Sequence, residues 1–320
     1  MKKYIILAVV LVLVIGVALI SETRETSKTQ FVLNTVSTIT VKGNHGKTVD
    51  SAFDRVAEIE SRMTSHSATS DIATGKLNLD TTYVISKAMG YSKTSGGSFD
   101  ITIKPICDLW DINGDNPRVP SREEINNALQ YVDYKNIAIN DGKLILPEGM
   151  ALELGAIAKG YAADEACRIL RECGIKDGII DLGGNIVALG TKTVGVRNPL
   201  SENDGDYFGT LKITDCAVAT SGGYERYFEQ DGVRYHHIFD PGTGYPVETD
   251  ILSATVIREK AIDADCWSTI LFSAGTQKAE EYINEHGLQA IIVDKYSNVY
   301  IYGNADFTLE ESANMNIVKK

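Results

Sequence analysis

The 320 residues suffice for one large domain or two ordinary ones, and 43 % apolar with 23 % charged residues is typical of a folded globular protein. The formal net charge of −12 argues against nucleic-acid binding, because phosphate backbones require a basic face. The five cysteines lack Cys-x-x-Cys and zinc-ligand spacing; their odd number argues against a full disulfide framework and favours buried thiols, with a Cys167–Cys173 disulfide as the alternative.

The first predicted element is the uncharged run 4–20, which follows Lys2 and Lys3. Two lysines ahead of an apolar stretch indicate a cytoplasmic N-terminus and a segment that enters the membrane. The run is at the short limit for a spanning helix and slightly longer than the usual core of a signal peptide. Ser21 stands near the place where a lipoprotein needs a cysteine, so a lipid anchor is not supported. We expect an uncleaved anchor, with cleavage after Ala18 as the alternative.

These features divide the chain into an anchor or signal helix (1–20), a polar linker (21–28) and one domain (29–320) outside the cytoplasmic membrane. Apolar periodicity and capping residues predict helices over 48–63, 82–92, 121–131, 158–173, 262–273 and 276–286. Alternation and apolar runs predict strands over 31–41, 179–189, 213–219, 234–239 and 251–257, and a closing hairpin from 288–293 and 299–302. No regular βαβ order is present, so the predicted fold class is α+β.

Two glycine-bearing stretches have candidate binding chemistry. The stretch 97–102 alone is most simply a loop that enters a strand. In the stretch 153–162 a glycine turn leads directly into a predicted helix, whose free N–H groups, together with Lys159, would suit an anion such as a phosphate. A solvated lysine on a helix explains this stretch equally well, and the spacing of a P-loop is absent.

The other candidates lie further along the chain. Gly183 and Gly184 interrupt an apolar strand, where a bulge is a simpler interpretation than the close approach of a ligand or another backbone. Asp265 and Thr269 share one face of a predicted helix and could ligate a hard cation such as Mg²⁺, or form an ordinary surface pair. The stretch 236–247, His-His-Ile-Phe-Asp-Pro-Gly-Thr-Gly-Tyr-Pro-Val, is either a structural turn or part of a site. Together these parts match phosphoryl transfer, which needs phosphate binding, a metal and a base.

Six short motifs occur in a fixed order. They are Gly97–Thr102 (Gly-x-Phe-Asp-x-Thr), Gly155–Asp164 (Gly-x-x-x-Lys-Gly-x-x-x-Asp), Gly183–Asn185 (Gly-Gly-Asn), Thr220–Tyr224 (Thr-Ser-Gly-x-Tyr), His237–Pro246 (His-x-x-Asp-Pro-x-Thr-Gly-x-Pro) and Ala264–Thr269 (Ala-Asp-x-x-x-Thr). In this order they resemble the ApbE family of flavin transferases over roughly residues 29–304. The chain departs from the family at 33–35, which reads Leu-Asn-Thr instead of Met-Gly-Thr, and at His66, where the family has another aromatic residue.

The resemblance implies an ApbE-like, T-fold-like α+β fold with mixed sheets flanked by helices. It implies FAD contacts at Leu33, His66, Ser98, Phe99, Asp100, Glu153 and Lys159. It implies Mg²⁺ ligands at Ala156, Asp265, Ser268 and Thr269, with main-chain carbonyls at Ala156 and Ser268. His237 is the candidate general base, because the unperturbed pKa of histidine lies near neutral pH.

The resemblance further implies Mg²⁺-dependent transfer of FMN from FAD to a Thr or Ser hydroxyl of an exported or membrane redox protein, with AMP released. Acceptors of such enzymes carry a motif similar to Asp-x-x-Ser/Thr-Gly-Ala/Ser-Thr. The stretches that begin at Asp71 and Asp240 fail this motif after the glycine, so we expect this chain to be the donor enzyme and not an acceptor. Two alternatives remain open: an FAD pyrophosphatase that gives FMN and AMP, and a non-catalytic, membrane-tethered flavin-binding protein.

Overall fold

The computed structural model describes residues 24–203, 205–313 and 315–320, so the predicted anchor and the first three residues of the predicted linker lie outside the described part. Within those ranges, no helix combines the length and apolar character that a membrane crossing requires. The centre of the structure is a nine-stranded sheet in which neighbouring strands are antiparallel, except for the last pair. The mixture of sheets and helices confirms the predicted α+β class.

The strands of the large sheet do not follow chain order. They lie in the order β1 (Glu25–Val32), β2 (Thr35–Lys42), β5 (Gly178–Leu182), β6 (Asn185–Leu189), β9 (Ala217–Gly222), β12 (Ile251–Arg258), β13 (Gln289–Asp294), β14 (Asn298–Tyr302) and β16 (Asn316–Lys319). The smaller sheets are β15 (Asp306–Leu309), β8 (Tyr207–Thr214) and β7 (Thr191–Arg197); β10 (Tyr227–Gln230) with β11 (Val233–His236); and β3 (Ala138–Asn140) with β4 (Lys143–Ile145).

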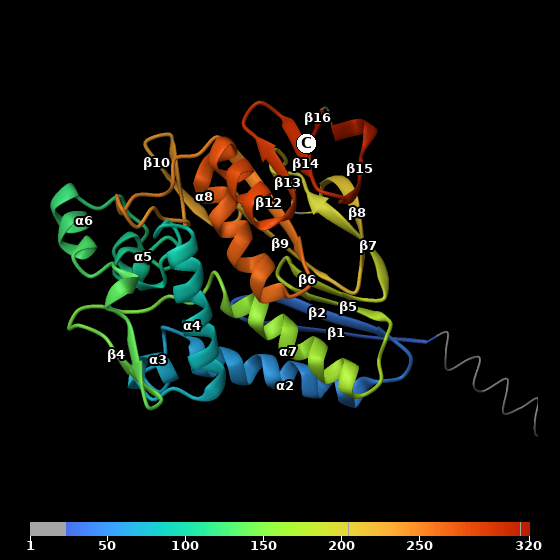
Figure 1. The fold of residues 1–320 in the computed structure, drawn as a ribbon, viewed down its shortest axis with the longest axis horizontal. Coiled ribbons are helices and arrows are strands. Elements are labelled where there is room, and N and C mark those ends of the chain that lie inside the picture. Colours follow the sequence, from blue (N-terminus) through green and yellow to red (C-terminus); the bar gives the residue numbers. More distant parts are fainter. Residues whose placement is uncertain (1–23, 204, 314) are drawn as a thin grey trace, which may run out of the picture.

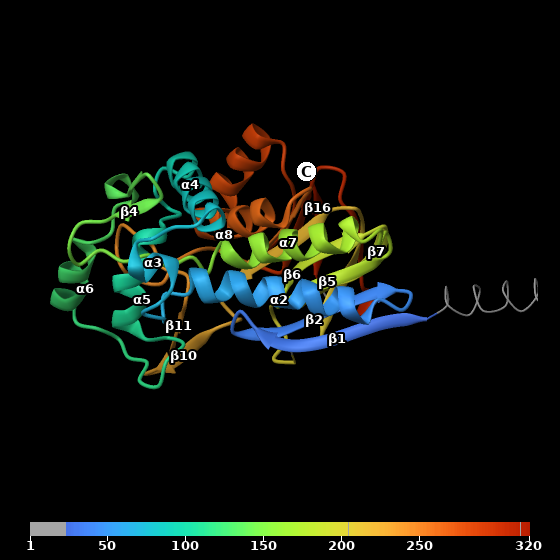
Figure 2. The same ribbon diagram turned by 90° about the horizontal axis from the view of Figure 1, so that it is seen from below.

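Three long helices cover one face of the large sheet: α2 (Gly46–Met63), α7 (Ala158–Glu172) and α8 (Ala261–His286). Figures 1 and 2 show α2 and α7 side by side over β1, β2 and β5, while α8 lies next to β9 and β12. The buried stripe of α2 follows the predicted helical spacing and packs on Ile39 and Val41 of β2. The main hydrophobic core is therefore the layer between these helices and the sheet.

The opposite face is covered in part by the three-stranded sheet. Phe208 and Leu211 of β8 pack against Val293 of β13 and Val299 of β14, which forms a second buried cluster. The strands from β9 to β14 are thus buried on both faces. This burial explains why their sequences are nearly continuous apolar runs without polar alternation.

The remaining helices gather at one end of the large sheet (Figure 1). They are α3 (Asp71–Thr74), α4 (Leu79–Thr94), α5 (Lys104–Trp110) and α6 (Arg122–Leu129), with 3₁₀ turns at Ile101–Ile103 and Tyr134–Asn136. A further 3₁₀ turn, Glu311–Ala313, lies between β15 and β16. Trp110 is the centre of a third cluster that includes Ile125 and Phe239. Its indole N–H donates to the Gly244 carbonyl at 2.8 Å. The group of small helices therefore holds in place the turn that contains Gly244, within the stretch 236–247.

The predicted helices are confirmed, with changes at their ends. The capping box of Ser121 and Glu124 begins α6, and Gly174, at φ 80°, ends α7 as predicted. The two helices predicted after residue 261 form one element, α8, that is broken at Gly275 by a non-helical backbone (φ 73°, ψ 161°). The loop 97–102 leads into a 3₁₀ turn and α5, and not into a strand as expected.

Three predicted strands were wrong because each one spans a tight turn. The segment 31–41 is the hairpin of β1 and β2, and β1 begins within the stretch predicted as linker. Its turn residues Leu33 and Asn34 both have φ 56°, the backbone of a two-residue hairpin turn. The segment 179–189 is the hairpin of β5 and β6, and the segment 213–219 combines the end of β8 with the start of β9. Such short turns interrupt the apolar pattern by only a few residues.

Candidate functional site

The N-terminal turns of α7 and α8 meet and place Asp265 at their junction. The Asp265 side chain is buried, and its Oδ2 accepts the backbone N–H of Gly160 at 2.9 Å. Its other oxygen, Oδ1, lies 3.6 Å from the Lys159 ammonium. The helix start predicted as an anion site therefore has one of its N–H groups occupied by a carboxylate of the protein. The second carboxylate oxygen is left facing a cation.

Hydroxyl groups surround this carboxylate. Thr269 lies one turn after Asp265, as predicted, and its hydroxyl is 3.4 Å from the Asp265 carbonyl, while the Ser268 hydroxyl donates to the same carbonyl at 2.9 Å. Ser221 from β9 contacts both of them, with its Oγ 2.9 Å from Ser268 Oγ and 3.2 Å from Thr269 Oγ1. The cluster is a set of hard oxygen donors around a single buried carboxylate. No group of three or more His, Cys, Asp and Glu side chains with metal-ligand geometry occurs among the described residues.

Glu153 holds the loop that leads into α7. Its Oε1 accepts the N–H of Gly155 at 3.0 Å, and its Oε2 accepts the hydroxyl of Ser65 at 2.9 Å. The Lys159 ammonium donates to the Gly155 carbonyl at 2.7 Å. This loop contains Ala156, whose carbonyl is a predicted ligand. Glu153 and Lys159 therefore fix the main chain beside Asp265.

The loop of Ser98, Phe99 and Asp100 lies next to Glu153, because the N–H of Glu153 donates to the Ile101 carbonyl at 2.7 Å. Phe99 is buried, and both carboxylate oxygens of Asp100 accept hydrogen bonds from the protein: Oδ1 from the N–H and hydroxyl of Thr102, and Oδ2 from the N–H of Tyr134. These two side chains stabilise the loop. His66 is exposed and follows Ser65.

The two adjacent histidines have different hydrogen-bond partners. His236, at the end of β11, uses both ring nitrogens: Nδ1 accepts the N–H of Ile238 at 3.2 Å, so Nε2 is protonated and donates to the Val247 carbonyl at 3.1 Å. His237 uses Nδ1, which donates to the Arg226 carbonyl at 3.2 Å. This bond fixes the tautomer of His237 and leaves the lone pair on Nε2.

Burial, helped by the positive charges of Arg226 and Lys159, lowers the pKa of His237 to about 3, although the bond to the Arg226 carbonyl raises it. The ring is therefore neutral near pH 7, which is the state that can accept a proton. Lys159, one of the charges that lower this pKa, also lies 3.6 Å from Asp265 Oδ1. Desolvation by the surrounding protein raises the pKa of Glu225, although the positive charges of Lys159 and Arg226 oppose that shift.

The hairpin turn of Leu33 reaches the site through Arg226. The guanidinium of Arg226 donates to the Asn34 carbonyl at 3.2 Å, and the Arg226 carbonyl accepts the hydrogen bond from His237. The neighbouring turn of Gly183 lies directly beside it, since a Cβ added at Gly183 would come within 2.3 Å of the Thr35 hydroxyl. The two glycines that were interpreted as a bulge thus form a second hairpin turn in close contact with the first.

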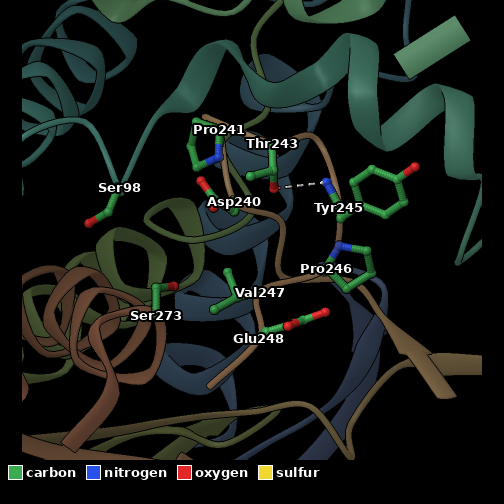
Figure 3. A pocket seen from close by; sticks show the side chains of 9 residues that line it. All are labelled: Ser98, Asp240, Pro241, Thr243, Tyr245, Pro246, Val247, Glu248 and Ser273. Carbon is green, nitrogen blue, oxygen red and sulfur yellow. Dashed lines mark hydrogen bonds between the residues drawn. The ribbon is translucent and has the colours of Figure 1, made fainter. Parts of the chain in front are cut away.

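The turn after the histidines borders a cavity of about 440 Å³ (Figure 3). Ser98, Thr243 and Glu248 contribute polar groups to its wall, together with the ring of Tyr245. Asp240 builds the turn, because its carbonyl accepts the N–H groups of Thr243 and Gly244. The stretch 236–247 therefore contains a structural turn that also lines this cavity.

The structure brings the predicted residues together in three connected groups: the Asp265 cluster, the Glu153 and Ser98 loops, and the His237 and Leu33 turns. Sequence analysis assigned no role to Ser221 or Arg226. Ser221 lies in a recognised motif, Thr220–Tyr224, which was the available signal. For Arg226 the contacts are with residues far away in the chain, so no local pattern indicated them.

Comparison with known proteins agrees with this geometry. The sequence profile of the ApbE family matches residues 33–292. An FAD:protein FMN transferase of Treponema pallidum is 35 % identical over 66 % of this chain and 64 % of its own length, just under two thirds. One from Klebsiella pneumoniae is 36 % identical over 68 % of this chain and 70 % of its own length.

Solved structures resemble the whole described fold. The ApbE protein of Thermotoga maritima superposes with a TM-score of 0.79 at 30 % identity, covering 90 % of this chain and 97 % of its own. The flavin transferase ApbE of Vibrio cholerae superposes with a TM-score of 0.75 at 22 % identity, covering 91 % of this chain and 98 % of its own. The second likeness concerns the fold alone.

Proposed function

This chain belongs to the ApbE family, and from that premise we propose that it is an FAD:protein FMN transferase, which moves FMN from FAD onto a target protein. The observation that carries the proposal is the state of His237. Its Nδ1 is held by the Arg226 carbonyl, its Nε2 has a lone pair, and its neutral form is stabilised by burial. Such an imidazole has the free, unprotonated nitrogen that a general base for a hydroxyl nucleophile needs.

The proposed reaction is a displacement at the phosphorus on the FMN side of FAD. His237 Nε2 takes the proton of a Thr or Ser hydroxyl of the acceptor, and the hydroxyl oxygen forms a bond to the phosphorus on the FMN side of FAD. The bridging P–O bond breaks and AMP leaves with the bridging oxygen. The product is FMN joined to the acceptor through a phosphoester.

The pyrophosphate of FAD would bind where α7 and α8 begin. Both helix N-termini carry partial positive charge, and Lys159 adds a full charge at the same place. The remaining predicted contacts are Leu33, His66, Ser98–Asp100 and Glu153. We propose that they hold the rest of FAD.

The donor set also suits Mg²⁺. Hard cations prefer carboxylate, hydroxyl and carbonyl oxygens, and Asp265 Oδ1, Thr269 Oγ1 and the carbonyls of Ala156 and Ser268 would supply them. The free Asp265 oxygen already faces the ammonium of Lys159, so the position accommodates positive charge. When bound, Mg²⁺ would neutralise negative charge on the pyrophosphate. In its absence Lys159 partly neutralises the carboxylate.

One experiment separates this function from its two rivals. The purified protein is incubated with FAD, Mg²⁺ and a candidate acceptor protein, followed by denaturing electrophoresis and nucleotide analysis. A fluorescent acceptor band with an equal amount of AMP supports transfer. Free FMN and AMP without a labelled acceptor indicate a pyrophosphatase, and bound but unchanged FAD indicates a flavin-binding protein.

The partners and the location are further parts of the proposal. We propose acceptors among exported or membrane redox proteins that carry a motif similar to Asp-x-x-Ser/Thr-Gly-Ala/Ser-Thr. We also propose that the segment 4–20 tethers the chain to the membrane with the body on the outer side. Lys2 and Lys3 ahead of an uncharged run support this orientation.

A further inference from the structure

The helices α7 and α8 are in backbone contact at their N-terminal turns. A Cβ added at Gly160 would lie 2.5 Å from the Ala261 carbonyl oxygen and 2.7 Å from Ile262 Cα. Only glycine permits this approach, because any side chain would meet main-chain atoms that cannot move aside. The first turn of α8 therefore lies directly on the first turn of α7.

Each of these helices is capped by an aspartate of the other. Asp265 of α8 accepts the N–H of Gly160, as described above. In return, Asp164 of α7 accepts the N–H of Ala261 at 2.8 Å with Oδ1 and that of Ile262 at 3.1 Å with Oδ2. The residue before α8, Lys260, makes no capping hydrogen bond with its side chain. Asp164 thus satisfies N–H groups that an ordinary N-cap residue would satisfy.

We propose that Asp164 is a positioning residue for the metal and phosphate site, an inference that rests on the proposed function. The two carboxylate oxygens of Asp164 bind two consecutive N–H groups of α8, an arrangement called the fork below. The fork fixes the first turn of α8 both along the helix axis and in its rotation about that axis. Asp265 lies one turn further along the same helix, so its carboxylate direction depends on that rotation. Without the fork, the bond from Gly160 to Asp265 is left to set the rotation of this turn, and Asp265 is less well oriented toward a cation.

A merely stabilising role is the competing explanation, and the chain offers a matched control. Asp250 caps the second half of the same helix, after the break at Gly275. Its Oδ1 accepts the N–H of Thr276 at 2.9 Å and its Oδ2 accepts the Thr276 hydroxyl at 2.6 Å. Asp164 and Asp250 therefore both accept a backbone N–H at the start of a segment of α8, but only Asp164 lies at the turn that carries Asp265.

The test compares D164N, D164E and D250N in the full chain. The probe is Mn²⁺ as a substitute for Mg²⁺, with binding followed by the loss of the free-ion EPR signal, alone and with ADP. Urea unfolding of each variant reports stability independently of activity. Partners that orient a metal ligand typically contribute 10–100-fold to metal affinity. We expect D164N to weaken Mn²⁺ binding about tenfold or more, and D250N to lose stability while it binds Mn²⁺ like the wild type.

D164E controls for charge and for folding. It keeps the negative charge but displaces the carboxylate, so weaker Mn²⁺ binding by D164E supports a positional effect. Wild-type affinity in both Asp164 variants would overturn the inference, as would equal losses of affinity in D164N and D250N. Absence of Mn²⁺ binding by the wild type would overturn it together with the proposed metal. Mn²⁺ binding by a wild type that transfers no FMN would refute the proposed activity alone.

Discussion

Replacement of His237 by alanine is the most direct test of the proposed chemistry. The substitution removes Nε2, the nitrogen that the Arg226 carbonyl leaves free to accept a proton. Few other contacts are lost, because the backbone N–H of His237 that also donates to Arg226 remains. The variant should therefore fold and bind FAD nearly as well as the wild type.

The size of the effect follows from the role of a general base. Loss of such a group typically lowers the rate by about 10²–10⁴. We expect a fall in the FMN transfer rate of this size for His237→Ala. The dissociation constant for FAD should change little, since His237 acts on the acceptor hydroxyl and not on FAD.

The pH dependence provides a second signature. In the free protein the pKa of His237 is lowered to about 3, so the base stays neutral on acidification, and kcat/KM should show no histidine limb between pH 7 and 5. Bound FAD brings a negatively charged pyrophosphate that pairs with Lys159, one of the cations that lower this pKa. The pKa should therefore rise in the complex, and the acid limb of kcat should lie at higher pH than that of kcat/KM.

The assay is single-turnover transfer at saturating FAD and Mg²⁺, with His236→Ala as the control. His236 has both ring nitrogens bonded and packs edge-on against Phe272, so its removal should cost stability and leave the transfer rate within a few fold. If His236→Ala lost transfer activity while His237→Ala kept it, the assignment of His237 as the general base would be refuted. Full activity in both variants would show that the base lies elsewhere.

Asp265→Ala should abolish Mg²⁺-dependent transfer while the circular dichroism spectrum stays that of the wild type, and retained activity that EDTA does not affect would contradict the metal assignment. Gly244→Ala should lower the free energy of unfolding, measured in urea, by about 2–4 kcal/mol. The reasons are that φ is +72° at this residue and that the new Cβ would lie 2.6 Å from Ile125 Cγ2. An unchanged unfolding midpoint would show that the turn adapts to the alanine. Protease added to intact protoplasts should digest the body of the protein; complete protection would exclude an outward-facing body, whereas release into the medium would indicate cleavage near Ala18.

The helices could be predicted because their signals are local. The apolar spacing of α2, the capping box of α6 and the glycine that ends α7 each act within a few residues. The strand pattern was less informative, since β1–β2 and β5–β6 are joined by two-residue turns, and an interruption of two residues can equally be a bulge within one strand. The first turn was not predicted, because leucine is unusual at a turn position with positive φ, as Leu33 is.

The sequence by itself determined the helices, the α+β class and the motif residues that form the candidate site. Only the tertiary structure decided how these residues are used. It placed Gly160 against Asp265, 105 residues away, and Asp164 against Ala261, 97 residues away. It also gave the adjacent side chains of His236 and His237, of which only His237 fits the motif, different carbonyl partners. Hydrogen bonds between distant segments depend on how helices and strands pack, and no local propensity specifies that packing.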